Sequence, residues 1–163
     1  MATLTTLAAE LGAALQTRGL VLALAESCTG GMAAQAVTSI AGSSAWFDRG
    51  FVTYSNAAKM EMLGVAAETL EKFGAVSEET AREMALGAIK HSHANVAASI
   101  TGIAGPGGGM PEKPVGTVCF GFALKKQVFT ATQTFTGDRE SIRAQSVEYA
   151  LKQLVALSLN GKL

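Results

Sequence analysis

The stretch Leu22-Ala-Leu-Ala-Glu-Ser-Cys-Thr-Gly-Gly-Met-Ala-Ala34 joins an apolar run to a helical pattern through two glycines. The run from residue 19 to 25 predicts a buried strand, and residues 30–40 predict a helix. A strand, turn and helix in this order direct the first N–H groups of the helix toward the space beyond the strand. Those groups and the helix dipole favour an anion there. The stretch therefore predicts a binding site at the carboxyl end of its strand.

Ser27 lies where a nucleophilic hydroxyl group is exposed in other strand-to-helix elbows. The alternative is that Ser27 and Thr29 only cap the helix. Cys28 is a rival nucleophile, but we favour a small buried residue because no histidine is obviously placed to activate its thiol.

Composition limits the class of protein. The chain has 163 residues, of which 48% are hydrophobic and 16% charged, as expected for one compact α/β domain over residues 1–163. Its 13 basic and 13 acidic residues balance, and the longest basic run is Lys125-Lys126, which argues against nucleic-acid binding. The N-terminus lacks a signal-peptide pattern, and no apolar run is long enough to cross a membrane. We expect a cytoplasmic protein.

Periodicity predicts alternating strands and helices. The predicted strands cover residues 19–25, 47–54, 96–100, 115–124 and 127–136, and the predicted helices cover residues 2–17, 30–40, 57–63, 66–73, 78–92 and 139–158. Lys125-Lys126 is a tight connection, so the last two strands should form an antiparallel hairpin. We expect an α/β fold of three layers, α/β/α, with a mixed, mainly parallel sheet of about five to six strands.

Three polar residues lie at the ends of predicted strands or just after them: Ser27, Tyr54 and Thr101. In open α/β sheets the site lies beyond the carboxyl ends of the strands, so their convergence favours an enzyme. Lys59 falls in the first turn of a predicted helix, where the dipole and partial burial would lower its pKa toward a neutral general base. A solvated lysine is the alternative. Ser44, in the loop 41–46, could face the site or simply lie on the surface.

Two further features suggest an anion site. The segment Thr101-Gly-Ile-Ala-Gly-Pro-Gly-Gly-Gly109 lets backbone approach a ligand, and it does not match the nucleoside-triphosphatase loop. Arg139 and Arg143 lie one turn apart near the start of the last helix and could grip a phosphate or carboxylate. The alternative is ion pairing with Asp138, Glu140 or Glu148. His91 and His93 have no apparent third ligand, so we predict no metal site.

Three motifs in order resemble those of the CinA C-terminal domain family: Ala25-Glu-Ser-Cys-Thr-Gly-Gly31, Tyr54-Ser-Asn-Ala-Ala-Lys59 and Thr101-Gly-Ile-Ala-Gly-Pro-Gly-Gly108. This family includes stand-alone nicotinamide mononucleotide deamidases. The resemblance runs from about residue 5 to about residue 158. It implies hydrolysis of the amide of nicotinamide mononucleotide to nicotinic acid mononucleotide and ammonia, a step of pyridine nucleotide salvage. It also implies a serine-lysine amidohydrolase without metal or cofactor that forms a homodimer or higher homo-oligomer.

The resemblance also implies roles for individual residues. Ser27 matches the motif serine and Lys59 the motif lysine, with Tyr54 and Ser44 as polar neighbours. Neutral Lys59, or Tyr54 acting with it, would take the proton of Ser27. Ser44 is a rival nucleophile or a proton bridge. Backbone N–H groups at 28–31 or at 101–102 would stabilise the oxyanion. The expected substrate-binding residues are Glu26, Thr29, Gly30, Gly31, Thr101, Gly102, Gly105, Gly107 and Arg139 or Arg143. Alternatives are a non-catalytic nucleotide or sugar-phosphate binding module and a competence- or damage-associated partner protein.

Overall fold

A computed structural model describes residues 3–163, so residue 2, with which the first predicted helix begins, lies outside the described residues. The described chain forms a five-stranded sheet in the order β2-β1-β3-β4-β5. Its strands are β1 (Leu22–Glu26), β2 (Phe47–Val52), β3 (Val96–Gly102), β4 (Thr117–Leu124) and β5 (Gln127–Thr134). β1 pairs in parallel with both β2 and β3, whereas β4 runs antiparallel to β3 and β5. The predicted mixed sheet and its terminal hairpin are confirmed.

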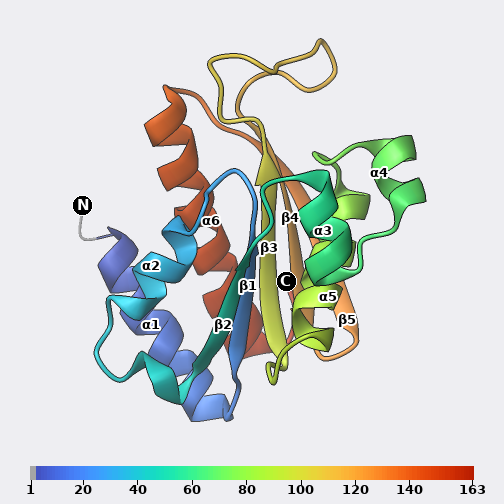
Figure 1. Cartoon of the computed structure of the whole chain (residues 1–163). Helices are drawn as coiled ribbons and strands as arrows, with labels where there is room; N and C mark the ends of the chain where they lie inside the picture. The colour runs from blue at the N-terminus through green and yellow to red at the C-terminus, as the bar shows by residue number, and fades with distance from the viewer. Residues whose placement is uncertain (1–2) are drawn as a thin grey trace.

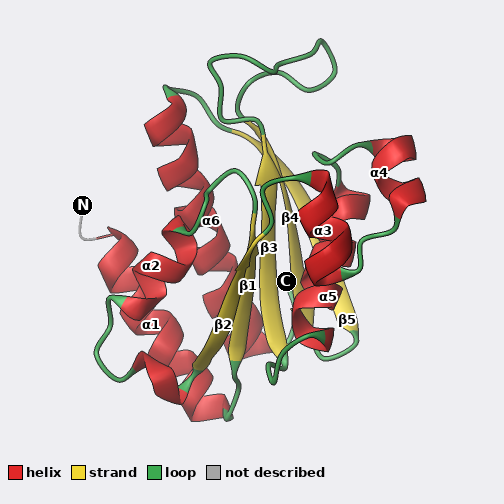
Figure 2. Cartoon of the chain, viewed as in Figure 1, coloured by secondary structure: helices red, strands yellow, loops and turns green. Residues whose placement is uncertain are grey.

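Helices cover both faces of the sheet (Figure 1, Figure 2). One face carries α1 (Thr3–Arg18), α2 (Met32–Thr38) and α6 (Arg139–Asn160), and the other carries α3 (Asn56–Leu63), α4 (Ala67–Phe73) and α5 (Glu78–Lys90). Alternate residues of the central strands supply the two cores: Leu22 and Leu24 of β1 face the first set of helices, and Ala23 and Ala25 face the second. The predicted three-layer α/β/α arrangement is confirmed. None of the described helices is both long enough and apolar enough to span a bilayer.

The boundaries of the first elements follow from three glycines. Gly19 has a φ of +63° and follows Arg18, the last residue of α1, so it ends this helix and does not begin the strand as predicted. Gly30 and Gly31, with φ of +58° and +108°, remain in the turn, so α2 begins at Met32 rather than at residue 30. The turn between β1 and α2 therefore spans residues 27–31 and starts with Ser27.

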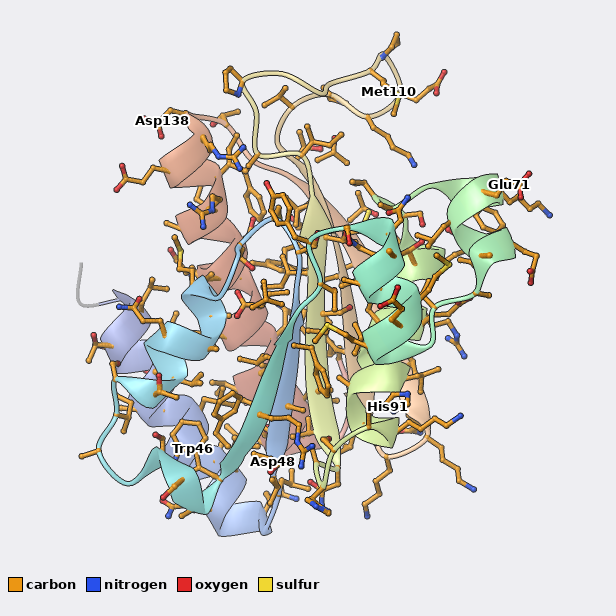
Figure 3. The ribbon with its side chains drawn as sticks, viewed as in Figure 1. Trp46, Asp48, Glu71, His91, Met110 and Asp138 are labelled. Atoms are coloured by element: carbon orange, nitrogen blue, oxygen red, sulfur yellow. The ribbon has the colours of Figure 1, made fainter. Side chains whose placement is uncertain are left out.

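The parallel strands β1, β2 and β3 end at the same edge of the sheet. Three connections start there: the glycine turn, the segment into α3, and the loop of residues 103–116 between β3 and β4. The same loop projects from the end of β3 in Figure 1. The N-terminus of α6 lies at this edge too, because Arg139, its first residue, donates a hydrogen bond to the carbonyl oxygen of Gly105 in this loop. Figure 3 shows Asp138, the N-cap of α6, at the same end of the molecule as Met110. This edge is where the sequence predicts the site.

Candidate active site

A cavity of about 300 Å³ opens beyond the carboxyl ends of β1, β2 and β3. It is lined by Ser27, Cys28, Tyr54, Asn56, Lys59, Ala75, Val76, Thr101, Gly102, Ile103, Ala104, Gly105, Gly107, Gly108 and Arg139. The three strand ends, the glycine loop and the start of α6 thus meet around one space. A larger cavity, of about 620 Å³, lies at the opposite edge, around the β4–β5 hairpin.

Ser27 and Lys59 are in direct contact. Ser27 is fixed at the end of β1 because its N–H donates to the carbonyl oxygen of Ile100 at 2.9 Å. Nζ of Lys59 lies 3.0 Å from Oγ of Ser27 and donates to the carbonyl oxygen of Thr53 at 2.9 Å. Ser27 is 8% exposed and Lys59 is 1% exposed. The pair predicted from separate motifs therefore forms one unit at the floor of the cavity.

Burial lowers the pKa of Lys59, and the nearby Cys28 thiol opposes this shift to a smaller extent. Neither of the two ion pairs found in the described residues involves Lys59. The lysine lies in the first turn of α3, which is capped by the Ser55 hydroxyl accepting from the N–H of Ala58 at 3.0 Å. Its ammonium form thus lacks both solvent and a countercharge, and the neutral amine that accepts a proton is favoured.

Cys28 is unsuited to act as the nucleophile. Burial raises the pKa of its thiol to about 11, although Arg143 acts in the opposite direction. The thiol remains protonated at neutral pH, and the thiolate is the reactive form. This supports the interpretation of Cys28 as a small buried residue.

Glu26 and Thr29 belong to the turn instead of the substrate site, which corrects the roles expected for them. The Glu26 carboxylate is 1% exposed and accepts from the Thr29 hydroxyl at 2.6 Å and from the N–H groups of Ala33 and Ala34 at 2.9 Å each. A longer bond of 3.3 Å comes from the N–H of Gly31. The carboxylate therefore occupies the N-terminus of α2, the position where the sequence suggested an external anion.

The two arginines of α6 face different parts of the site. Nη1 of Arg139 donates to the carbonyl oxygen of Gly105 at 2.8 Å, and Nη2 donates to the Tyr54 hydroxyl at 3.2 Å. Arg143 donates to the carbonyl oxygens of Cys28 and Thr29, both at 3.0 Å. Neither forms an ion pair among the described residues, and Glu148 pairs with Lys152 instead. The ion-pair alternative is therefore wrong, and of the two only Arg139 lines the cavity.

Tyr54 lies at the rim. Its side chain is 63% exposed, and its hydroxyl is bound to Arg139 and has no described hydrogen bond to Ser27 or Lys59. The Thr101 hydroxyl donates to the carbonyl oxygen of Ala75 at 2.9 Å, which ties β3 to the segment before α5. Gly105 and Gly107 line the cavity, and a Cβ added to Gly107 would meet no atom within 4 Å.

Ser44 is not part of this site. It is exposed in a short 3₁₀ turn, Ser43–Ala45, that precedes β2. The N–H of Leu22, at the start of β1, donates to the carbonyl oxygen of Trp46 at 2.8 Å, so this turn lies at the amino edge of the sheet. Figure 3 shows Trp46 at the end of the molecule opposite Asp138 and Met110. The length of β1, about 16 Å at 3.3 Å per residue, separates Ser44 from Ser27 and excludes a proton bridge.

Two structural contributions were missed from the sequence. The carbonyl oxygen of Thr53 holds Lys59, and Ala75 and Val76 close one side of the cavity. Backbone acceptors leave no signature in a residue pattern, although Thr53 directly precedes the predicted Tyr54.

Residues 3–163 contain no cluster of three or more His, Cys, Asp or Glu side chains with metal-binding geometry. His93, one of the two histidines considered as metal ligands, donates its backbone N–H to the Asp48 carboxylate at 3.0 Å.

Comparisons with known proteins show the family to which the chain belongs. The family model described as the CinA C-terminal domain matches residues 4–158. The chain is 60% identical over 147 residues to the nicotinamide-nucleotide amidohydrolase PncC of Enterobacter agglomerans, covering 90% of each chain. It is 55% identical over 149 residues to PncC of Escherichia coli strain K12, covering 91% of this chain and 90% of that one. The crystal structure of the competence/damage inducible protein CihA from Agrobacterium tumefaciens superposes with a TM-score of 0.92 at 50% identity, covering 95% of both chains.

Proposed function

The chain belongs to the CinA C-terminal domain family, and from this premise we propose that it hydrolyses the amide of nicotinamide mononucleotide with Ser27 as nucleophile and Lys59 as base. The products are nicotinic acid mononucleotide and ammonia. The observation that carries the assignment of residues is the 3.0 Å contact between Oγ of Ser27 and a buried lysine whose pKa is lowered.

The first half of the proposed reaction forms an acyl-enzyme. Neutral Lys59 accepts the proton of the Ser27 hydroxyl while Oγ attacks the carboxamide carbon. The resulting Lys59 ammonium group then donates a proton to the amide nitrogen, the C–N bond breaks, and ammonia leaves. One buried amine thus serves as base and then as acid, as amide cleavage requires.

The second half releases the acid. Lys59, neutral again, accepts a proton from a water molecule that attacks the Ser27 ester. The ester bond breaks, the carboxylic acid is released, and Ser27 recovers its proton from Lys59. This sequence consumes one water per amide and restores both side chains.

Two backbone N–H groups are positioned to stabilise the oxyanion. The N–H of Cys28 follows the nucleophile directly, the position of the donor in other nucleophile elbows, and it has no hydrogen bond to another described residue. The N–H of Ile103 donates to Thr117 of β4 at 2.9 Å. Because successive strand N–H groups alternate in direction, the N–H of Gly102 points away from β4, toward the space beyond the end of β1. Ser27, Cys28 and Gly102 all line the cavity.

The substrate phosphate is proposed to bind between Arg139 and the glycine loop. Arg139 is exposed, and both of its described partners are uncharged oxygen atoms, which a phosphate can replace with a stronger charge-assisted bond. Gly105 and Gly108 have φ of +78° and +90°, so the loop backbone can turn its N–H groups inward.

A binding module that only holds a nucleotide does not need Lys59. Burying a lysine without a countercharge costs stability, and the contact with Ser27 supplies no compensating charge. Catalysis explains the arrangement because a general base must be neutral near the working pH. We further propose, from the family resemblance, that the chain acts in the cytoplasm as one domain and assembles as a homodimer or higher homo-oligomer.

The direct test is the release of ammonia and nicotinic acid mononucleotide when the purified chain is incubated with nicotinamide mononucleotide. Equimolar products are expected from the wild type and none from Ser27→Ala. Equal product release by both proteins would contradict the proposed nucleophile. Absence of product from a folded wild type would contradict the activity.

A further inference from the structure

We infer that Arg143 is a positioning residue that acts through the backbone of Cys28, and that it does not bind substrate. The inference rests on the proposed function, because the Cys28 N–H is one of the two proposed oxyanion donors. It divides the arginines of α6 between two tasks: Arg139 faces the ligand, and Arg143 fixes the turn that presents Ser27.

The guanidinium group of Arg143 spans two successive carbonyl groups. Nε donates to the carbonyl oxygen of Cys28 and Nη2 to that of Thr29, each at 3.0 Å. Arginine carries its donors in a rigid, planar fork, so two bonds fix the relative orientation of two peptide groups. Lysine would present a single point of attachment. The half-buried Arg143 side chain crosses from α6 to the turn, which links two elements more than a hundred residues apart.

Three consecutive peptide groups of the turn are thereby held by their carbonyl oxygens. The carbonyl of Ser27 accepts from the N–H of Gly30 at 3.0 Å, and Arg143 holds the next two. Residue 28 therefore lies between two peptide planes that are each fixed by a hydrogen bond. Because the N–H of Cys28 belongs to the first of these planes, its direction is set by this arrangement.

The residues that follow are held by Glu26. Its carboxylate accepts from the N–H groups of Gly31, Ala33 and Ala34. Glu26 thus fixes the donors of the turn and the start of α2, while Arg143 fixes the acceptors that precede them. A donor that is oriented before the reaction stabilises the oxyanion without reorganisation during the chemical step.

Gly30 leaves room for the approach of Arg143. A Cβ at residue 30 would lie 3.3 Å from Nη2 of Arg143, closer than ordinary packing allows. The φ of +58° at the same residue is also unfavourable for a side chain. Gly30 therefore serves the contact with Arg143 as well as the turn.

The test compares steady-state kinetics of Arg143→Lys, Arg143→Met and Arg139→Ala with the wild type. For nicotinamide mononucleotide we expect kcat to fall about 10-fold in Arg143→Lys and about 100-fold in Arg143→Met, toward the loss seen when an oxyanion donor is removed. KM should stay within about twofold in both, because the interaction acts in the transition state. Arg139→Ala should show the opposite pattern, a raised KM. A raised KM with an unchanged kcat in the Arg143 variants would identify Arg143 as a substrate ligand and overturn the inference.

A second measurement does not depend on turnover. Amide hydrogen exchange at Gly30, whose N–H is bonded within the turn, should be about tenfold faster in Arg143→Met and Arg143→Lys, because local opening governs such exchange. It should be unchanged in Arg139→Ala. Unchanged exchange in the Arg143 variants would overturn the inference even if the wild type proved inactive on nicotinamide mononucleotide, whereas inactivity with altered exchange would contradict only the proposed function.

Discussion

Nη2 of Arg139 lies 3.2 Å from the hydroxyl group of Tyr54, and this hydrogen bond joins the start of α6 to the segment after β2. The same guanidinium group holds the glycine loop through Gly105. Arg139 thus connects three segments around the cavity while lacking a carboxylate partner among the described residues. An uncompensated cation at the rim of a polar cavity is suited to bind an anionic part of a substrate.

Arg139→Ala should weaken substrate binding. Loss of a hydrogen bond to a charged group costs about 1.5–3 kcal/mol, so we expect KM for nicotinamide mononucleotide to rise roughly 10- to 150-fold with a smaller change in kcat. Tyr54→Phe, which removes only the hydroxyl partner, should change KM by less than about threefold. Steady-state kinetics on the three proteins measures both effects.

Nicotinamide riboside separates the phosphate from the rest of the substrate. The wild type should process it with a much lower kcat/KM than the mononucleotide, and Arg139→Ala should reduce that difference by removing the phosphate contact. If the preference for the mononucleotide is as large in Arg139→Ala as in the wild type, the phosphate binds elsewhere.

Three single-atom changes rank the possible nucleophiles. Ser27→Ala should abolish turnover, since among the described residues Ser27 has the only hydroxyl group hydrogen-bonded to Lys59. Cys28→Ala should keep activity within about threefold because the buried thiol is protonated. Ser44→Ala, at the other edge of the sheet, is the matched serine control and should behave as the wild type. Product release from Ser27→Ala at more than a trace rate would reject the assignment.

The buried lysine should also affect stability. The pKa of Lys59 is lowered in the folded state, whereas in the unfolded chain it returns to about 10.4. Between these two pKa values the unfolded state binds more protons, so the free energy of unfolding should increase as pH rises through this interval. Below the lowered pKa the contribution of Lys59 is unfavourable and constant.

Lys59→Met removes this pH-dependent contribution. Urea unfolding of the wild type and Lys59→Met at several pH values measures this contribution. The free energy of unfolding of the wild type minus that of Lys59→Met should increase as the pH rises. Lys126→Met, at the exposed hairpin turn, is the control for removing a lysine from the chain. A wild-type advantage that declines with rising pH would mean that Lys59 is buried as an ammonium group.

The fold was predictable because its signals are local. Continuous apolar runs predict β1 and β3, which are buried on both faces, and the Lys125-Lys126 turn predicts the pairing of β4 with β5. The observed start of a helix differs from the predicted start where the backbone conformation of glycine determines it. Gly30 and Gly31 delayed the start of α2, a detail that the amino-acid pattern alone does not fix.

The site was predictable only in part. Ser27 and Lys59 follow adjacent parallel strands, so topology brings them together. Ser44 was misplaced because a loop before a parallel strand lies at the edge opposite to a loop after it. Glu26 was misassigned because the motif does not reveal that its carboxylate turns back onto the N-terminus of α2. The different contacts of Arg139 and Arg143 could not be predicted, because the sequence does not show which of these two residues of α6 faces the cavity.

The central claim is that neutral Lys59 takes the proton of Ser27, and the pH dependence of kcat/KM tests it most directly. In the wild type, kcat/KM should rise with pH through the lowered pKa of Lys59 and then level off. NMR titration of the Lys59 side chain in the free enzyme should give the same pKa. Lys59→Arg should be inactive across the range, because a guanidinium group stays protonated. A substantial rate in Lys59→Arg, or a rising limb that persists in Lys59→Met, would contradict the account.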